Sequence, residues 1–214
     1  MRLFLIAPLL AAIALPAAAQ IPCRDATGLP DPKTEAAPPQ ANHFHRVVGK
    51  GLACAVSNAE GEAMSERKRP VTFLPCLRIG AVGVSDDRKV VEELLGEPTQ
   101  ISDLDLRTEA RVYPIHQRSV PEPYYVVTYQ DDVAVAVQLI GPPTEMPATF
   151  SGLSLGQPAQ AAIETLGKPV QRCMMRRKGP ETWMWPPFPI GVDVLDGHIV
   201  GFKVTWPAGR PTPN

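Results

Sequence analysis

The sequence predicts an α+β protein built from two tandem repeats, each a short helix packed on an antiparallel β-sheet. The pattern L-G-x-P-x-Q occurs at residues 95–100 and again at 166–171. Each copy is followed by a segment with the composition of a β-hairpin, which indicates an internal duplication. In addition, 25 of the 214 residues are proline. This argues against a helical bundle, because proline removes a backbone donor and clashes inside helices.

Each copy of the pattern ends a short amphipathic helix. In the second copy, apolar residues from Ala159 to Leu166 recur at helical spacing and therefore share one face. Gly167 suits the left-handed conformation that often follows a helix. In the first copy, Ser85 is the expected N-cap, and Gly96 ends the helix. Both helices are short and need a sheet to pack against.

A hairpin follows each predicted helix. Residues 124–129 (YYVVTY) are rich in aromatic and β-branched side chains, and residues 133–140 form the partner strand. The turns fall at residues 131–132 in the first copy and 196–197 in the second. When the turns are aligned, large apolar residues coincide on one side of the strands. This alternation predicts an apolar sheet face under each helix.

A turn ending in glycine, a short helix ending in L-G-x-P and a hairpin with an acidic turn resemble a known unit. They are similar to the superfamily that contains the small outer-membrane-assembly lipoproteins and the tandem-repeat β-lactamase inhibitor proteins. The resemblance covers residues 77–140 and 153–205. It implies a helix layer against an antiparallel sheet, no catalysis, and surfaces that bind other envelope or secreted proteins. This chain departs from the lipoproteins by carrying two copies, and no contact residue is carried over from the inhibitors.

The N-terminal residues indicate export. Residues 1–19 show the charged start, apolar core and small-residue end of a secretory signal peptide, and the apolar core is too short to span a membrane. We expect a periplasmic protein, with an extracellular one as the alternative, and no transmembrane segment in the mature chain.

The other predicted regions are a Pro-rich flexible segment (20–42), an N-terminal extension with short strands and a polar loop (43–75), repeat unit 1 (76–141), repeat unit 2 (150–206) and a disordered tail (207–214).

Four cysteines follow the signal peptide, and no two have C-x-x-C spacing. An even number in an exported protein predicts two disulfides, for which three pairings are possible. We favour Cys54–Cys76 with Cys23–Cys173, because the first pair flanks a single polar loop. The alternatives are lipidation of Cys23 and a free nucleophilic cysteine.

The sequence contains no recognisable catalytic constellation. It lacks a G-x-S-x-G motif and a phosphate-binding glycine loop, and helix starts and turns account for its acidic pairs. His43 and His45 would lie on one side of a strand, a workable geometry for zinc or copper, but no third ligand has a diagnostic spacing. The net charge of −1 argues against nucleic acid as a partner. We expect no metal and no other cofactor.

The densest aromatic segment predicts a protein-binding surface. Residues 183–190 (WMWPPFPI) combine two tryptophans and a phenylalanine with three prolines, which gives rigid contact area at low entropic cost. In the alternative interpretation, one of the tryptophans simply caps the protein core. The predicted contact residues are Trp183, Trp185, Phe188, Tyr124 and Tyr125.

These features together predict an exported, soluble, non-catalytic module. It would bind another envelope or secreted protein through the sheet surface and the aromatic, proline-rich segment. The rival hypothesis is a periplasmic enzyme or a small-ligand or metal-binding protein that uses His43, His45 and a cleft between the repeats. A large enclosed pocket lined by histidines and carboxylates would favour the rival, whereas a shallow aromatic surface would favour protein binding.

Overall fold

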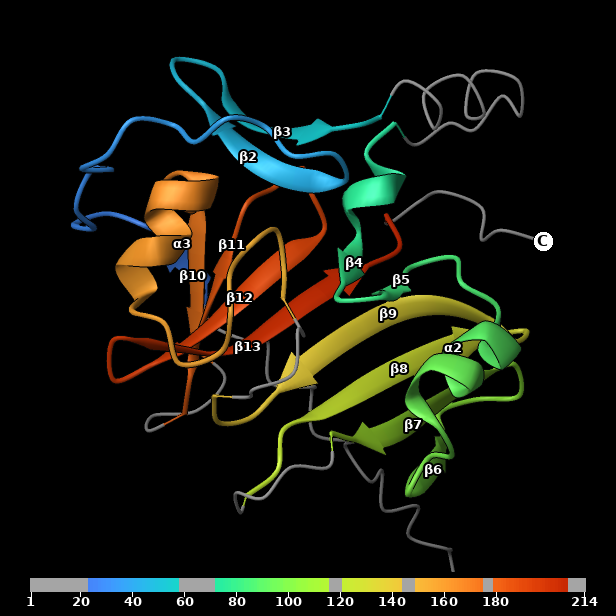
Figure 1. Ribbon diagram of the computed structural model, residues 1–214. Helices are drawn as coiled ribbons and strands as arrows, with labels where there is room; N and C mark the ends of the chain where they lie inside the picture. Colours follow the sequence, from blue (N-terminus) through green and yellow to red (C-terminus); the bar gives the residue numbers. More distant parts are fainter. Residues whose placement is uncertain (1–22, 58–71, 116–120, 144–148, 175–178, 208–214) are drawn as a thin grey trace, which may run out of the picture.

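One antiparallel sheet of nine strands organises the chain in the computed structural model (Figure 1). The structure describes residues 23–57, 72–115, 121–143, 149–174 and 179–207. The predicted signal peptide and residues 208–214 of the predicted tail lie outside these ranges. In spatial order, the strands are β1 (Cys23–Asp25), β10 (Gln171–Met174), β11 (Glu181–Met184), β12 (Ile190–Leu195), β13 (His198–Thr205), β9 (Val133–Ile140), β8 (Tyr124–Gln130), β7 (Thr108–Pro114) and β6 (Gln100–Asp103).

Two helices and two small hairpin sheets lie on one side of the large sheet (Figure 1). Among the described residues, no helix is long and apolar enough to cross a membrane. The elements on this side are β2 (His43–Val47), β3 (Gly51–Ala55), the short 3-10 helix Leu74–Cys76, β4 (Arg78–Ile79), β5 (Val82–Gly83), α2 (Arg88–Leu95) and α3 (Ala159–Leu166).

The predicted α+β fold of two helix-on-sheet repeats is wrong. The protein is mostly β, with two short α-helices beside a nine-stranded sheet. The two predicted units are not separate, because β9 and β13 pair with each other in that one sheet. Each of these strands would otherwise be an edge, and joining them satisfies two rows of backbone groups. Local sequence patterns indicate hairpins and helices, but they do not indicate which hairpins pair with each other along their edge strands.

The junction between β9 and β13 is closely packed around a glycine. A Cβ atom on Gly201 would lie 2.9 Å from a carboxylate oxygen of Asp193 and 3.2 Å from the carbonyl oxygen of Leu139. The pairing register shifts by one residue near each hairpin turn, because Val135 of β9 and Val200 of β13 have no partner on the facing strand. The repeat boundaries given above remain a prediction.

Side chains alternate between a buried and a solvent-facing side of the large sheet. On the buried side, the hydroxyls of Tyr113 and Tyr129 lie 3.1 Å apart, and Phe202 is fully buried. The helices and small sheets pack on this side (Figure 1). On the other side, residues such as Gln138 and Lys203 are partly exposed. The core therefore lies between the large sheet and the thin layer formed by the smaller elements.

The ends of both helices follow local rules. Gly96 and Gly167 follow the last turns with φ angles of 82° and 83°, and each donates its N–H to the carbonyl oxygen four residues earlier. Gly167 ends α3 with the positive φ that favours glycine, but its ψ of 179° lies outside the left-handed helical conformation predicted for it. The start of α2 differs from the prediction, because Asp87 rather than Ser85 is the N-cap. Its carboxylate accepts a hydrogen bond from the N–H of Lys89 at 2.9 Å.

Helix α2 is held to the sheet largely by charged contacts. Val91 is its one fully buried side chain. Glu92 pairs with Arg111 of β7 at 2.5 Å, and Arg111 also pairs with Glu109 at 2.8 Å. Arg88 adds a second ion pair to Glu109 at 3.2 Å. The apolar face of α2 does not by itself predict that ion pairs attach the helix to β7.

The segment predicted to be Pro-rich and flexible is attached to the fold at two places. β1 pairs with β10, and a disulfide joins Cys23 to Cys173 across that pair. Further along the chain, the backbone N–H of Thr34 donates to the carboxylate of Glu164 in α3 at 2.9 Å. Both attachments depend on partners more than 100 residues away, which local composition cannot indicate.

Candidate functional site

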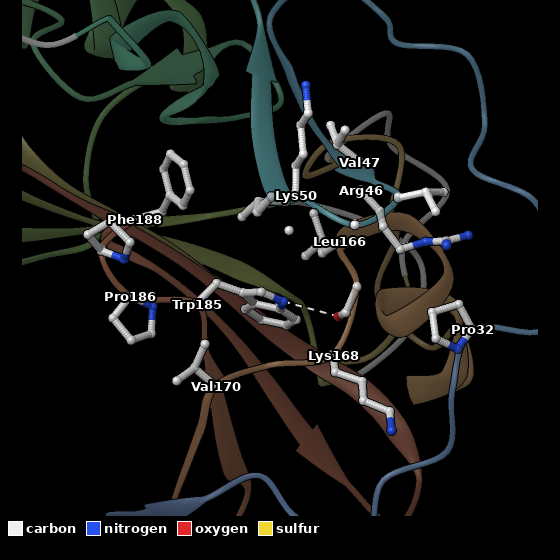
Figure 2. Close-up of a pocket in the computed structure, with 16 residues that line it drawn as sticks. Pro32, Arg46, Val47, Lys50, Leu166, Lys168, Val170, Trp185, Pro186 and Phe188 are labelled. Carbon is white, nitrogen blue, oxygen red and sulfur yellow. Dashed lines mark hydrogen bonds between the residues drawn. The ribbon is translucent and has the colours of Figure 1, made fainter.

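A groove of about 420 Å³ lies where the β2–β3 hairpin meets the end of α3 and the segment that follows β11. We call it the Trp185 groove. Figure 2 shows the Trp185 indole at its centre, between Leu166 and Val170, with Phe188 to one side. Cationic side chains extend around the indole (Figure 2). The groove is thus assembled from four segments that are separated in the sequence: Pro32, residues 46–52, residues 166–170 and residues 185–188.

The aromatic, proline-rich segment forms one wall of the Trp185 groove. Trp185 is only 3% exposed, and its indole N–H donates to the carbonyl oxygen of Gly167 at 3.1 Å. Phe188 packs edge-on against Phe44 and Phe73, with ring centroids 5.3 and 5.2 Å apart. Edge-to-face contacts add to the stabilisation that burial provides. The wall is therefore held in place by both the end of α3 and the aromatic core.

Three cationic side chains line the groove, and none of its described lining residues carries a carboxylate. The guanidinium of Arg46 donates to two backbone carbonyl oxygens at 2.7 and 3.3 Å. Lys168 pairs with Asp31 at 2.7 Å. The ammonium of Lys50 makes no hydrogen bond or ion pair with any residue that the structure describes. The groove therefore presents positive charge around an aromatic floor.

The carboxylate of Glu164, which lies outside the groove, holds the chain segment that forms the wall at Pro32. Glu164 of α3 accepts hydrogen bonds from the backbone N–H groups of Lys33 and Thr34 at 2.8 and 2.9 Å, and from the Thr34 hydroxyl at 2.6 Å. The Thr34 hydroxyl and then the Lys33 N–H lower the pKa of Glu164 to about 2, because they stabilise its charged form. These bonds hold Pro32, which lines the groove, beside α3.

Large apolar side chains are exposed at the rim. Val48, in the β2–β3 turn, is 74% exposed, and Val170, between α3 and β10, is 51% exposed. Both line the groove together with Phe188. A contiguous apolar surface bordered by polar groups is typical of an interaction site.

The structure places the five predicted contact residues in three environments. Trp185 and Phe188 line the groove. Trp183 is buried in the core, where its indole N–H donates to a carboxylate at 2.9 Å. Tyr125 is buried too, and desolvation raises its pKa to about 12. Tyr124 is half-buried on the opposite side of the sheet, because neighbouring residues in a strand point to opposite sides. The five residues therefore do not form one surface.

Sequence reasoning missed the cationic border of the groove. Arg46 and Lys50 fall in a segment that was expected only to contain short strands. Lys168 occupies the variable third position of the second L-G-x-P-x-Q pattern. The available signal was V-V-G-K-G at residues 47–51, which is typical of a hairpin turn. Which surface the turn approaches depends on tertiary packing.

The two candidate metal ligands, His43 and His45, border a different hollow of about 210 Å³. Among the described residues, no group of three or more His, Cys, Asp or Glu side chains could hold a metal ion. The Nδ1 atoms of both rings are buried and have no hydrogen-bond partner there. The described part of the chain thus brings no third ligand to this pair.

Two disulfides are present, Cys23–Cys173 and Cys54–Cys76, which is the pairing favoured from the sequence. The first joins the edge strand β1 to β10. The second joins β3 to the short 3-10 helix that precedes β4. It thereby anchors the β2–β3 hairpin, which supplies one wall of the Trp185 groove.

Two half-buried acidic groups elsewhere, Asp86 and Asp193, have structural partners. Burial raises the pKa of Asp86 and of Asp193. Asp86 accepts a hydrogen bond from the N–H of Gly83 at 2.7 Å, and Asp193 accepts one from the hydroxyl of Thr182 at 2.5 Å. Neither carboxyl lines the Trp185 groove. Each supports local structure and is separate from the groove.

No protein-family model matches the sequence, and no curated protein matches it. Among solved structures, the chain is similar to a cysteine-rich secretory protein of Staphylococcus aureus, with 16% identity and a TM-score of 0.39 over 57% of this chain and 44% of that one. A DUF4309-family protein of Bacillus subtilis shows 13% identity and a TM-score of 0.38, over 61% and 82% of the two chains. A protein of Streptococcus mutans described as a candidate β-lactamase inhibitor shows 11% identity and a TM-score of 0.26, over 68% and 95%. Likenesses of this strength carry no argument about function.

Proposed function

We propose that this protein is an exported, non-catalytic binding module that holds a segment of another envelope or secreted protein in the Trp185 groove. The observation that carries the proposal is the groove itself. It exposes the apolar side chains of Val48 and Val170 at its rim, and its described lining contains neither histidine nor carboxylate. A catalytic centre would need titratable groups that converge on a reacting atom. The rival enzyme hypothesis therefore finds no support at this site.

The size of the groove favours an extended segment as the ligand. A volume of about 420 Å³ takes up a few side chains rather than a folded domain. The exposed Val48 and Val170 at the rim enlarge the apolar contact that such a segment can make. Rigid walls also reduce the entropic cost of binding, because little has to be ordered.

The two disulfides support export. Disulfides persist in oxidising compartments and are rare in the cytosol. Together with the signal-peptide pattern at residues 1–19, they favour the periplasm, with the extracellular space as the alternative.

Partner capture with surface variants tests the proposal. We expect crosslinking in the native cell envelope to recover a protein partner with the wild type and to lose it with Val48→Asp or Val170→Asp. Both side chains are exposed, so the substitutions should leave the fold intact. The matched control is Ile101→Asp on β6, where the side chain is 53% exposed, and it should recover the partner at the wild-type yield. Equal recovery with all three variants would contradict the proposal.

A further inference from the structure

We infer that the segment bound by the Trp185 groove is acidic, with an apolar side chain against the exposed rim of Val48 and Val170 and carboxylates beside Lys50 and Lys168. The inference rests on the proposed function and names the chemistry of its ligand. It follows from the charges around the groove, from their availability, and from their arrangement about the indole.

The positive charge is concentrated at the groove and does not reflect the composition of the chain. The whole sequence has 21 Lys and Arg against 22 Asp and Glu. The described lining of the groove has Arg46, Lys50 and Lys168 and no acidic residue. A local excess of one sign on a nearly neutral protein favours a ligand of the opposite sign.

The charges are available to a ligand. Lys50 has no ionic partner among the described residues. Lys168 pairs with Asp31, whose side chain is 87% exposed, and an ion pair exposed to this degree contributes little stability. The backbone carbonyls that hold Arg46 leave its positive charge uncompensated. Glu164 lies outside the lining, and its oxygens already accept hydrogen bonds from the 33–34 segment.

The arrangement favours a peptide over a simple anion. In Figure 2, Lys50 and Lys168 extend in different directions on opposite sides of the Trp185 indole. In an extended peptide, successive side chains on one side are spaced by two residues. A pattern of acidic, apolar and acidic side chains can therefore meet one lysine, the apolar rim and the other lysine. A free phosphate or a polyanionic glycan would leave the apolar floor and the exposed Val170 unused.

The test compares three blocked peptides with one apolar core, acidic (EELVEE), neutral (QQLVQQ) and basic (KKLVKK), on the mature protein. Fluorescence anisotropy measures affinity, and NMR follows the indole N–H signal of Trp185. We expect the acidic peptide to bind about tenfold more tightly than the neutral one, equivalent to about 1.4 kcal/mol. The advantage should shrink at about 0.5 M salt, because salt screens exposed charges. The tighter binding of the acidic peptide should be reduced by Lys50→Glu and abolished by the double variant Lys50→Glu/Lys168→Glu. The control is Lys89→Glu, the same charge change on exposed α2, which should leave the preference for the acidic peptide intact.

The outcomes separate the inference from the proposed function. If acidic and neutral peptides bind equally and both shift the Trp185 signal, the acidic preference is overturned while segment binding stands. If dextran sulfate competes as well as the acidic peptide and the apolar core makes no difference, the groove merely attracts polyanions and the inference is overturned. If no peptide binds while envelope capture still depends on Val48, the stated ligand chemistry is wrong. If capture is also independent of Val48, both proposals fall.

Discussion

The carboxylate of Glu164 binds Thr34 twice, through the backbone N–H at 2.9 Å and through the hydroxyl at 2.6 Å. The contact connects α3 with a segment 130 positions earlier in the chain. It fixes Pro32 beside the groove and places Asp31 near Lys168. One wall of the candidate binding site is therefore built by the segment that composition alone predicted to be flexible.

The Glu164 contact should depend on pH. Its pKa is about 2 in the folded protein against an ordinary value of 4.5. The stabilisation from this contact is therefore complete above about pH 4.5 and is lost as the pH falls toward 2. Hydrogen exchange, corrected for its intrinsic pH dependence, should show the N–H groups of Lys33 and Thr34 losing protection over this range. At pH 7, Glu164→Ala should remove that protection, and Glu93→Ala, an exposed glutamate of α2, should not. Unchanged protection in Glu164→Ala would contradict this role.

The two disulfides should contribute unequally to stability. On the chain-entropy model, the Cys54–Cys76 bond, which closes a separation of 22 residues, contributes about 3 kcal/mol. The Cys23–Cys173 bond closes a separation of 150 residues and contributes about 5 kcal/mol. Urea unfolding of the two paired Cys→Ser variants measures both values. A smaller loss for the Cys23–Cys173 pair would show that only the edge strand β1 is released.

The ion pairs beneath α2 should contribute measurably to stability because they are largely shielded from solvent. The side chain of Arg111 is 12% exposed, and its removal leaves the carboxylates of Glu92 and Glu109 without this cation. We expect Arg111→Ala to lower the free energy of unfolding by about 2–3 kcal/mol. The exposed Arg107–Asp131 pair provides the control, since solvent screens it and Arg107→Ala should lower the free energy of unfolding far less than Arg111→Ala. Equal losses in urea unfolding would rule out the shielding argument.

The junction that unites the sheet should tolerate no side chain at Gly201. A Cβ there would lie 2.9 Å from a carboxylate oxygen of Asp193, which Thr182 also binds, and 3.2 Å from the carbonyl oxygen of Leu139 in β9. We expect Gly201→Ala to destabilise the protein by about 1–3 kcal/mol, the usual cost of overpacking. Gly83→Ala serves as the control, because its Cβ would meet nothing closer than 3.5 Å. A thermal melt that shows no difference between the two variants would contradict the close packing at this junction.

The sequence predicted most of what local patterns encode. The helix that ends at Leu166 and the hairpin strands around residues 131–132 lie where spacing and turn chemistry place them. The favoured cysteine pairing is also the one present. These features depend on neighbouring residues, or on the small number of possible pairings.

The sheet junction and the composition of the groove could not be predicted in this way. β9 and β13 pair through the edges of two hairpins, and nothing in the sequence of either strand indicates which edge strand it pairs with. Among the predicted contacts, Tyr124 and Tyr125 are included because they occupy the equivalent strand of the first repeat, but strand alternation places them on opposite sides of the sheet. Nothing in the local sequence singles out Lys50 and Lys168, because only the fold brings their segments together around Trp185.

Photocrosslinking from position 48 tests most directly whether the Trp185 groove binds a protein segment. Val48 is 74% exposed, so a photoreactive amino acid can replace it without disturbing the core. Irradiation of intact cells should give a covalent adduct with another exported protein from position 48, and no such adduct from position 101 on β6. If position 48 gives no protein adduct, or if position 101 gives the same one, the groove is not the binding site.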